Sequence, residues 1–204
     1  GALAGQIVGA REVVVQAIHA PYEASTVDAA LAAALIADGA AWLRSAGAVH
    51  DRLVGGNPGL ASVLQVGAGA VVTSAGGLTV QSDVALNGAF GAGYLGLSAA
   101  GDLALKASVS DGFSGADRAT ATLASAPSST LALEAGRDVT LALGTTVRTG
   151  TGDVSVTAGR DVAFAPRLAP GDAGAAVYTA GARTATPVAF LGAPRVIYRR
   201  MQVH

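Results

Sequence analysis

Two closely similar stretches decide the fold of this chain: residues 131–141 read LALEAGRDVTL, and residues 154–164 read VSVTAGRDVAF. Each consists of two short runs of alternating apolar residues joined by a turn, at Gly136 in the first and at Gly159 in the second. The apolar positions, the glycine and the Arg-Asp pair all repeat at an offset of 23 residues. A repeat of this length is typical of a stacked architecture, because a unit of a few short strands cannot bury its apolar face alone.

The pattern extends toward the amino terminus. A third copy, LGLSAAGDLAL, occupies residues 95–105, and a weaker one, LTVQSDVAL, occupies residues 78–86. The third copy lies 36 residues before the copy at 131–141, which we interpret as one turn of 23 residues with 13 residues inserted. The insertion is placed within residues 109–129, where a long polar stretch separates two apolar runs.

These repeats predict an all-β fold, a right-handed parallel β-helix (β-solenoid). Strands one turn apart should stack on one another, so that Leu131 pairs with Val154 and Val139 pairs with Val162. Every second side chain would point into a narrow interior, which agrees with an aromatic content of only 4 %. The alternative is an antiparallel β-sandwich in which the Gly-Asp and Gly-Arg-Asp sequences form hairpin turns.

The first sixty residues depart from the repeat and divide the chain into three parts. We expect strands of the β-helix within residues 1–22, a helical excursion over residues 23–59, and the remaining rungs over residues 60–204. We also expect the whole chain to be a fragment of a larger protein.

The helical excursion has its own sequence signals. Ser25 is the expected N-cap, since Asp28 stands three residues later as in a capping box. Gly39 would divide the helix in two, and the GGNPG sequence at residues 55–59 would end it. An apolar stripe along the helix predicts packing on the β-helix, with binding of a partner as the alternative.

Composition excludes several classes of function. The 14 acidic and 13 basic residues give a net charge of −1, so no basic field attracts nucleic acid or an anionic membrane. The absence of cysteine excludes a disulfide framework, a thiolate metal site and a cysteine nucleophile. The sequence contains no charge-free apolar stretch of about 18 residues, so no membrane-spanning helix is predicted. A mean hydropathy of +0.48 indicates a folded chain rather than a disordered one.

Several phrases of the sequence carry a family resemblance. They are GQIVGAREVVVQA at 5–17, VTSAGGLTVQSD at 72–83, LSAAGDLALKASVSDGF at 97–113, VRTGTGDVSVTAGRDVAF at 147–164 and AAVYTAGARTA at 175–185. In this order, with a helical segment between the first two, the chain resembles the filamentous haemagglutinin family of large bacterial exoproteins. The resemblance is to an internal region far from the amino-terminal secretion domain.

The resemblance implies a β-helical shaft of a secreted adhesin. Export would use an outer-membrane two-partner-secretion transporter of a Gram-negative bacterium, and the shaft would be displayed at the cell surface or released. Its implied use is adhesion, through a glycan or protein on a host cell or on another bacterium. The alternative is the stalk of a contact-dependent growth-inhibition toxin.

We expect no enzymatic activity, no cofactor and no metal site. The three histidines lack a metal-ligand motif such as HExxH, and no GxSxG sequence is present. The aspartates of the repeat region follow glycine or arginine at predicted turns, where an aspartate side chain forms hydrogen bonds with the backbone nearby. These aspartates are Asp102, Asp138, Asp153 and Asp161. A carbohydrate-active β-helix enzyme, which needs titratable groups converging on one face, is the less favoured alternative.

The Gly-Arg-Asp corners suggest a surface feature. Arg137 and Arg160 occupy equivalent places on neighbouring rungs, where two like charges would repel unless Asp138 and Asp161 alternate with them. We therefore expect a ladder of alternating charge, with a basic strip for acidic glycans as the alternative.

The insertion within residues 109–129 is the candidate contact surface, because binding residues concentrate on loops held by rigid scaffolds. Its extra residues have no place in a regular rung, so a loop should leave the β-helix here. The candidate contact residues are Asp111, Phe113, Asp117 and Arg118. The alternative is a spacer loop in which Phe113 packs on the outer wall. In either case, deletion of residues 110–126 should leave the chain folded.

Overall fold

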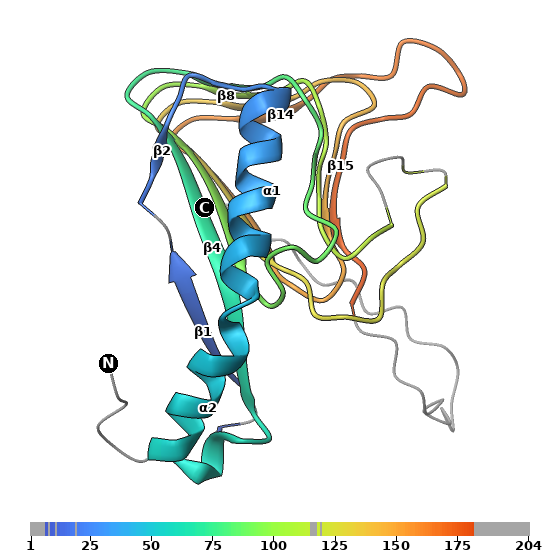
Figure 1. The fold of residues 1–204 in the computed structure, drawn as a ribbon. Helices are drawn as coiled ribbons and strands as arrows, with labels where there is room; N and C mark the ends of the chain where they lie inside the picture. The colour runs from blue at the N-terminus through green and yellow to red at the C-terminus, as the bar shows by residue number, and fades with distance from the viewer. Residues whose placement is uncertain are drawn as a thin grey trace, which may run out of the picture.

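The computed structural model describes residues 7, 9–10, 12–18, 20–114, 118 and 120–181. In this part of the chain, three β-sheets surround a common interior and two α-helices lie at one end (Figure 1). All twelve pairings between the strands are parallel, so the antiparallel alternative is wrong.

The strands are short and are distributed over the three sheets in a regular way. The first sheet contains β1 (Val13–Ile18), β2 (Tyr22–Glu23), β4 (Leu64–Ser74), β7 (Tyr94–Ala99), β10 (Thr130–Ala135) and β13 (Val154–Ala158). The second contains β3 (Thr26–Val27), β5 (Leu78–Val80), β8 (Leu103–Leu105), β11 (Val139–Leu141) and β14 (Val162–Phe164). The third contains β6 (Val84–Ala85), β9 (Val109–Ser110), β12 (Thr146–Thr149) and β15 (Ala176–Thr179).

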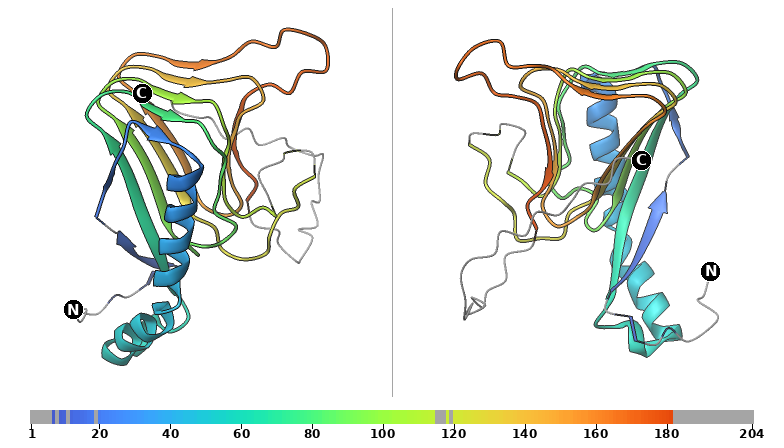
Figure 2. Two further views of the ribbon diagram at one scale, coloured as in Figure 1. Left: turned by 45° about the horizontal axis from the view of Figure 1, so that its top comes forward. Right: turned by 180° about the vertical axis from the view of Figure 1, so that it is seen from behind.

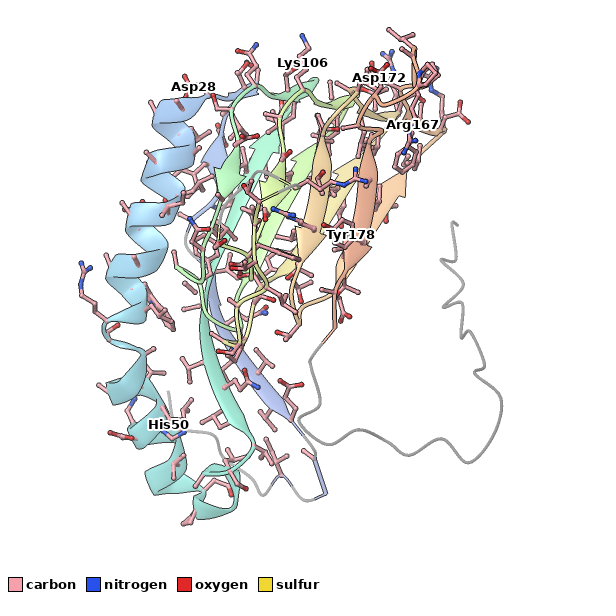
Figure 3. The ribbon with its side chains drawn as sticks, turned by 90° about the vertical axis from the view of Figure 1, so that its right-hand side faces the viewer. Asp28, His50, Lys106, Arg167, Asp172 and Tyr178 are labelled. Atoms are coloured by element: carbon pink, nitrogen blue, oxygen red, sulfur yellow. The ribbon has the colours of Figure 1, made fainter. Side chains whose placement is uncertain are left out.

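From β4 onward the chain visits the three sheets in the same order. We call one such passage a coil: the first coil is β4–β6, the second β7–β9, the third β10–β12 and the fourth β13–β15. Before them, β1 and β2 pair with β4, and β3 pairs with β5. Figure 3 shows the coils following one another from the helices outward.

The register predicted from the repeat is confirmed. Leu131 pairs with Val154, and Val139 pairs with Val162, each at the predicted offset of 23 residues. Leu95 pairs with Leu131, so the interval of 36 residues contains a single coil together with an excursion between β9 and β10. The weaker copy is shifted by one strand: its first run, Leu78–Val80, pairs with Leu103–Leu105, which is the second run of the third copy.

The interior between the sheets is the main hydrophobic core. It is built from rows of leucine, valine and alanine that occupy equivalent positions in successive coils, such as Leu97 and Leu133, which are 1 % and 2 % exposed. Small aliphatic side chains fill this interior because three sheets that enclose it leave little width. Burial of each such leucine stabilises the fold by roughly 1.5–3 kcal/mol.

The helical excursion comprises α1 (Ala29–Leu43) and α2 (Ala46–Gly56), followed by the short 3₁₀-helix η1 (Pro58–Leu60). Helix α1 lies across the amino-terminal end of the stacked coils, where the views in Figures 1 and 2 both place it over the interior. Leu35 of α1 is fully buried in the main core. The expected packing of this helix on the β-structure is therefore confirmed.

Two details of the helix prediction were wrong. The N-cap is Asp28, whose side chain accepts a hydrogen bond from the backbone N–H of Leu31, because Thr26–Val27 is already a strand paired with β5. Gly39 does not break the helix. It allows a close approach instead, since a Cβ at this position would overlap the ring of the buried Phe90. The break lies after Leu43, where α2 begins a new direction.

A second, smaller core holds α2. Leu53, Leu60 and Leu64 are its buried members, and valines of β1 and β4 pack against them. Within the described residues no single helix is long and apolar enough to cross a membrane; α1 and α2 together have the length and composition but are bent by 43°.

The fourth coil is the outermost described strand of every sheet. Its inward-facing residues are less buried than their counterparts: Phe164 is 42 % exposed, whereas Leu141, its partner in the third coil, is 2 % exposed. No described strand covers β13, β14 or β15 on the other side. The part of the predicted rungs beyond residue 181 lies outside the described residues.

Candidate contact surface

The excursion between β9 and β10 is shorter than the sequence predicted. Val109 and Ser110 are not part of a loop, since they form β9 and pair with β6 and β12. At the other end, Ser128 and Ser129 are 4 % and 0 % exposed. The polar residues at both ends of the predicted loop are thus inside the fold, and only the residues between them leave the sheets.

Asp111 is a buried structural residue and not a contact residue. It is 0 % exposed. Its Oδ1 accepts hydrogen bonds from the backbone N–H groups of Gly88 and Gly112, both at 2.8 Å, and its Oδ2 accepts one from Ser129 at 2.7 Å. These three donors belong to the corners that follow β6, follow β9 and precede β10. One carboxylate therefore ties together the corners of successive coils.

The excursion starts as a small hairpin. Phe113 and Leu123 form an isolated antiparallel bridge. Next to it, the N–H of Ser114 donates to the carbonyl of Thr122 at 3.0 Å, and the N–H of Ala124 donates to the carbonyl of Gly112 at 2.8 Å. The hairpin thus has a defined base, which holds Phe113 in place.

Phe113 docks this hairpin on the third sheet. It is 8 % exposed, and the guanidinium carbon of Arg148 lies 4.2 Å from its ring centroid. Tyr178 meets the same ring edge-on, with 6.2 Å between the centroids. Because Val147 belongs to the interior core, its neighbour Arg148 on the same strand points to the outer face of the sheet. In the structure Phe113 therefore packs on the outer wall, as the alternative interpretation predicted.

Arg148 is itself buried by this arrangement. Only 1 % of it is exposed. Its Nε donates to Ser110 Oγ at 3.1 Å, and its Nη1 donates to the Tyr178 hydroxyl at 3.3 Å. The sequence analysis did not identify Arg148. The residues next to an outward-facing arginine look the same whether a distant loop covers its side chain or the side chain faces solvent.

The remaining two candidate residues have different outcomes. Asp117 lies outside the described residues. Arg118 is exposed, and its Nη1 donates to the carbonyl of Gly174 at 2.9 Å, in the excursion between β14 and β15. Of the described candidates, Arg118 alone lies at the surface as expected.

A shorter deletion should therefore be tolerated where the longer one is not. Replacement of residues 115–121 by Asn-Gly, a two-residue hairpin turn, keeps the Phe113–Leu123 pair and should change the free energy of unfolding by less than about 1 kcal/mol. Deletion of 110–126 removes the buried Asp111 and Phe113 and should unfold the chain or destabilise it severely. Urea denaturation of both variants checks this, and equal stability of the two would show that the base of the hairpin is dispensable.

The ladder of alternating charge at the corner between the first two sheets is confirmed, but the carboxylates that pair with the arginines are those of Asp102 and Asp138, not of Asp138 and Asp161 as predicted. Arg137 pairs with Asp102 at 3.0 Å, and Arg160 pairs with Asp138 at 2.6 Å. The hydrogen bond from the Arg160 guanidinium holds the pKa of the Asp138 carboxyl below its usual value. The aspartates also hold the backbone, since the N–H of Asp161 donates to Asp138 Oδ1. These are exposed structural contacts between coils.

A small pocket under α1 was not anticipated. It has a volume of about 130 Å³ and lies between the helix and the first sheet, with Leu35, Trp42 and Phe90 among its lining residues. Tyr22 and Asp38 also line it, and the Tyr22 hydroxyl donates a short hydrogen bond to the Asp38 carboxylate. Burial and this carboxylate raise the pKa of Tyr22 to about 12. In the described part of the chain, no group of three or more His, Cys, Asp or Glu residues could hold a metal ion.

Comparisons with family models, with curated proteins and with solved structures find no match to this sequence.

Proposed function

We propose that the chain is a segment of the right-handed β-helical shaft of a large secreted surface adhesin of the filamentous haemagglutinin type. The observation that carries the proposal is the repeated passage through three parallel sheets in register, with strands one repeat apart stacked on one another. Such a stack is extended by adding coils, which is the geometry that a long shaft requires.

The open side of the fourth coil supports a shaft that continues. Phe164 and the other inward-facing residues of that coil are partly exposed, and the backbone of β13, β14 and β15 has no described partner on this side. A further coil stacked here would bury the apolar side chains and satisfy the free edges. At the opposite end, α1 covers the interior, so growth in that direction would have to go around the helix.

The way in which polar side chains are used supports a structural role. Asp111 and Asp138 accept hydrogen bonds from the backbone of neighbouring coils. The corner aspartates and arginines neutralise one another in pairs. We therefore propose that the segment has no hydrolase or lyase activity of its own. The stalk of a contact-dependent toxin has the same architecture and is the second candidate; the two differ in what the rest of the parent protein carries.

The proposal predicts export that depends on the partner transporter. The parent reading frame, with an epitope inserted in place of residues 115–121, should become accessible to antibody on intact cells only when the two-partner-secretion transporter is present. A second epitope on a cytoplasmic protein controls for lysis. Accessibility that is unchanged without the transporter, or retention inside cells that have it, would contradict the proposal.

A further inference from the structure

The small pocket under α1 has an apolar interior and one polar side. Its inner wall includes Leu35 and Phe90, which are 0 % and 1 % exposed. Its outer side is lined by Ile18 and Asp38, which are exposed, and by the half-buried Tyr22. A ligand would therefore enter past a carboxylate and a hydroxyl and then reach apolar walls.

The size of the pocket follows from small residues in its walls. Five lining residues are glycine or alanine, and they come from β1, α1 and β4: Ala17, Gly39, Ala68, Gly69 and Ala70. The volume of about 130 Å³ is similar to that of an engineered apolar cavity of about 150 Å³ in another protein, which binds benzene. The pocket therefore has room for one six-membered ring but not for an extended acyl chain.

Two aromatic side chains line the interior. Trp42 comes from α1, and Phe90 comes from the corner between β6 and β7. Aromatic rings pack favourably against one another, and the face of a tryptophan also attracts a cation. A ligand with an aromatic ring and a positive charge would therefore gain more from these walls than a neutral aliphatic one.

The polar side of the pocket carries a negative charge. Asp38 is the only charged residue among the described residues that line it, and it forms no ion pair with any described residue. Its Oδ2 accepts the hydrogen bond from the Tyr22 hydroxyl, which stays protonated at neutral pH because its pKa is raised to about 12. Asp38 Oδ1 accepts no hydrogen bond from a described residue, so one carboxylate oxygen is available to a ligand.

We infer that this pocket binds a small primary amine that carries an aromatic ring, with the ring between the apolar walls and the ammonium group donating to Asp38. An anion of the same shape would be repelled by the carboxylate. A sugar would leave its hydroxyls without partners against the apolar walls. The inference goes beyond the proposed function and does not depend on it, because the pocket lies within a single chain.

The fluorescence of Trp42 tests this inference directly, because it is the only tryptophan of the chain and lines the pocket. The purified chain is titrated with benzylamine, with benzyl alcohol and with benzoate, which share one ring and differ in charge. We expect benzylamine to give a saturable change in Trp42 emission, benzyl alcohol to bind at least fivefold more weakly, and benzoate not to bind.

One pair of variants tests the charge. Asp38→Asn keeps an acceptor for the Tyr22 hydroxyl but removes the negative charge, and it should weaken benzylamine binding about fivefold. The binding of benzyl alcohol should change little. Asp51→Asn makes the same change at an exposed position of α2 and should leave both affinities as they are.

A second pair of variants tests the cavity. Ala17 alternates along β1 with Val13 and Val15, which pack toward α2, so its side chain lies on the face of β1 turned toward the helices. Ala17→Leu should fill the pocket and abolish binding of benzylamine and benzyl alcohol without lowering the temperature of thermal unfolding. Ala104→Leu makes the same substitution on β8, away from the pocket, and should leave binding intact.

Several results would overturn the inference: no saturable change with benzylamine, equally tight binding of benzoate, equal losses in Asp38→Asn and Asp51→Asn, or wild-type binding by Ala17→Leu. Each of these results leaves the export experiment unaffected, so the shaft proposal would stand or fall separately.

Discussion

Asp111→Ala is expected to lower the free energy of unfolding by about 3 kcal/mol or more. The substitution leaves three backbone N–H groups, those of Gly88, Gly112 and Ser129, without their acceptor at a site that is 0 % exposed. Each buried donor that loses its partner costs about 1–3 kcal/mol. Urea denaturation followed by circular dichroism measures the change.

Two further variants separate the contributions at this corner. Asp111→Asn keeps one acceptor oxygen but turns an amide donor toward a backbone donor, so its loss of stability should be intermediate. Asp153→Ala removes an exposed corner aspartate and should change the stability by less than about 0.5 kcal/mol. If Asp111→Ala were as mild as Asp153→Ala, the carboxylate would not be the link between coils that the hydrogen bonds indicate.

Phe113→Ala is expected to cost about 3 kcal/mol and to release the hairpin from the third sheet. The ring is 8 % exposed and packs between Arg148 and Tyr178, so its loss opens a cavity over a buried guanidinium. The base of the hairpin should then open, and limited proteolysis at residues 114–122 should become faster. Phe164→Ala, at a ring that is 42 % exposed, is the matched control with a smaller effect.

A double-mutant cycle isolates the interaction between the cation and the ring. Phe113→Leu keeps an apolar side chain without the aromatic face, and Arg148→Met keeps the aliphatic stem without the charge. The coupling energy should be about 1–2 kcal/mol. Additive effects of the two substitutions would show that Phe113 acts through apolar packing alone.

The stacking of the coils could be predicted from the sequence because it depends on short-range patterns. Alternating aliphatic residues and a glycine corner repeat with the same spacing in 131–141 and 154–164, so the pairing of Leu131 with Val154 follows from matching the two copies. The ladder of Arg137 and Arg160 followed in the same way, since residues at equivalent positions of stacked repeats must be neighbours.

The helix boundaries show that contacts between residues distant in the sequence override local sequence signals. Ser25 satisfies the rules for an N-cap, but Thr26–Val27 joins β5, and the helix therefore begins only after Asp28. Gly39 has the low helix propensity expected of a helix breaker, yet the helix continues because the small residue fits against Phe90. Neither β5 nor Phe90 is near the helix in the sequence.

The candidate contact surface was the least predictable part, because burial of a polar residue depends on partners that only stacking assembles. Asp111 and Phe113 belong to a polar stretch that is indistinguishable in sequence from a solvated loop. Their surroundings come from residues 18 to 23 positions away, at Gly88 and Ser129, and from Arg148 and Tyr178 farther along the chain. Alternation and turn chemistry are carried by consecutive residues and can be recognised in isolation, whereas the environment of a side chain exists only once the coils have packed.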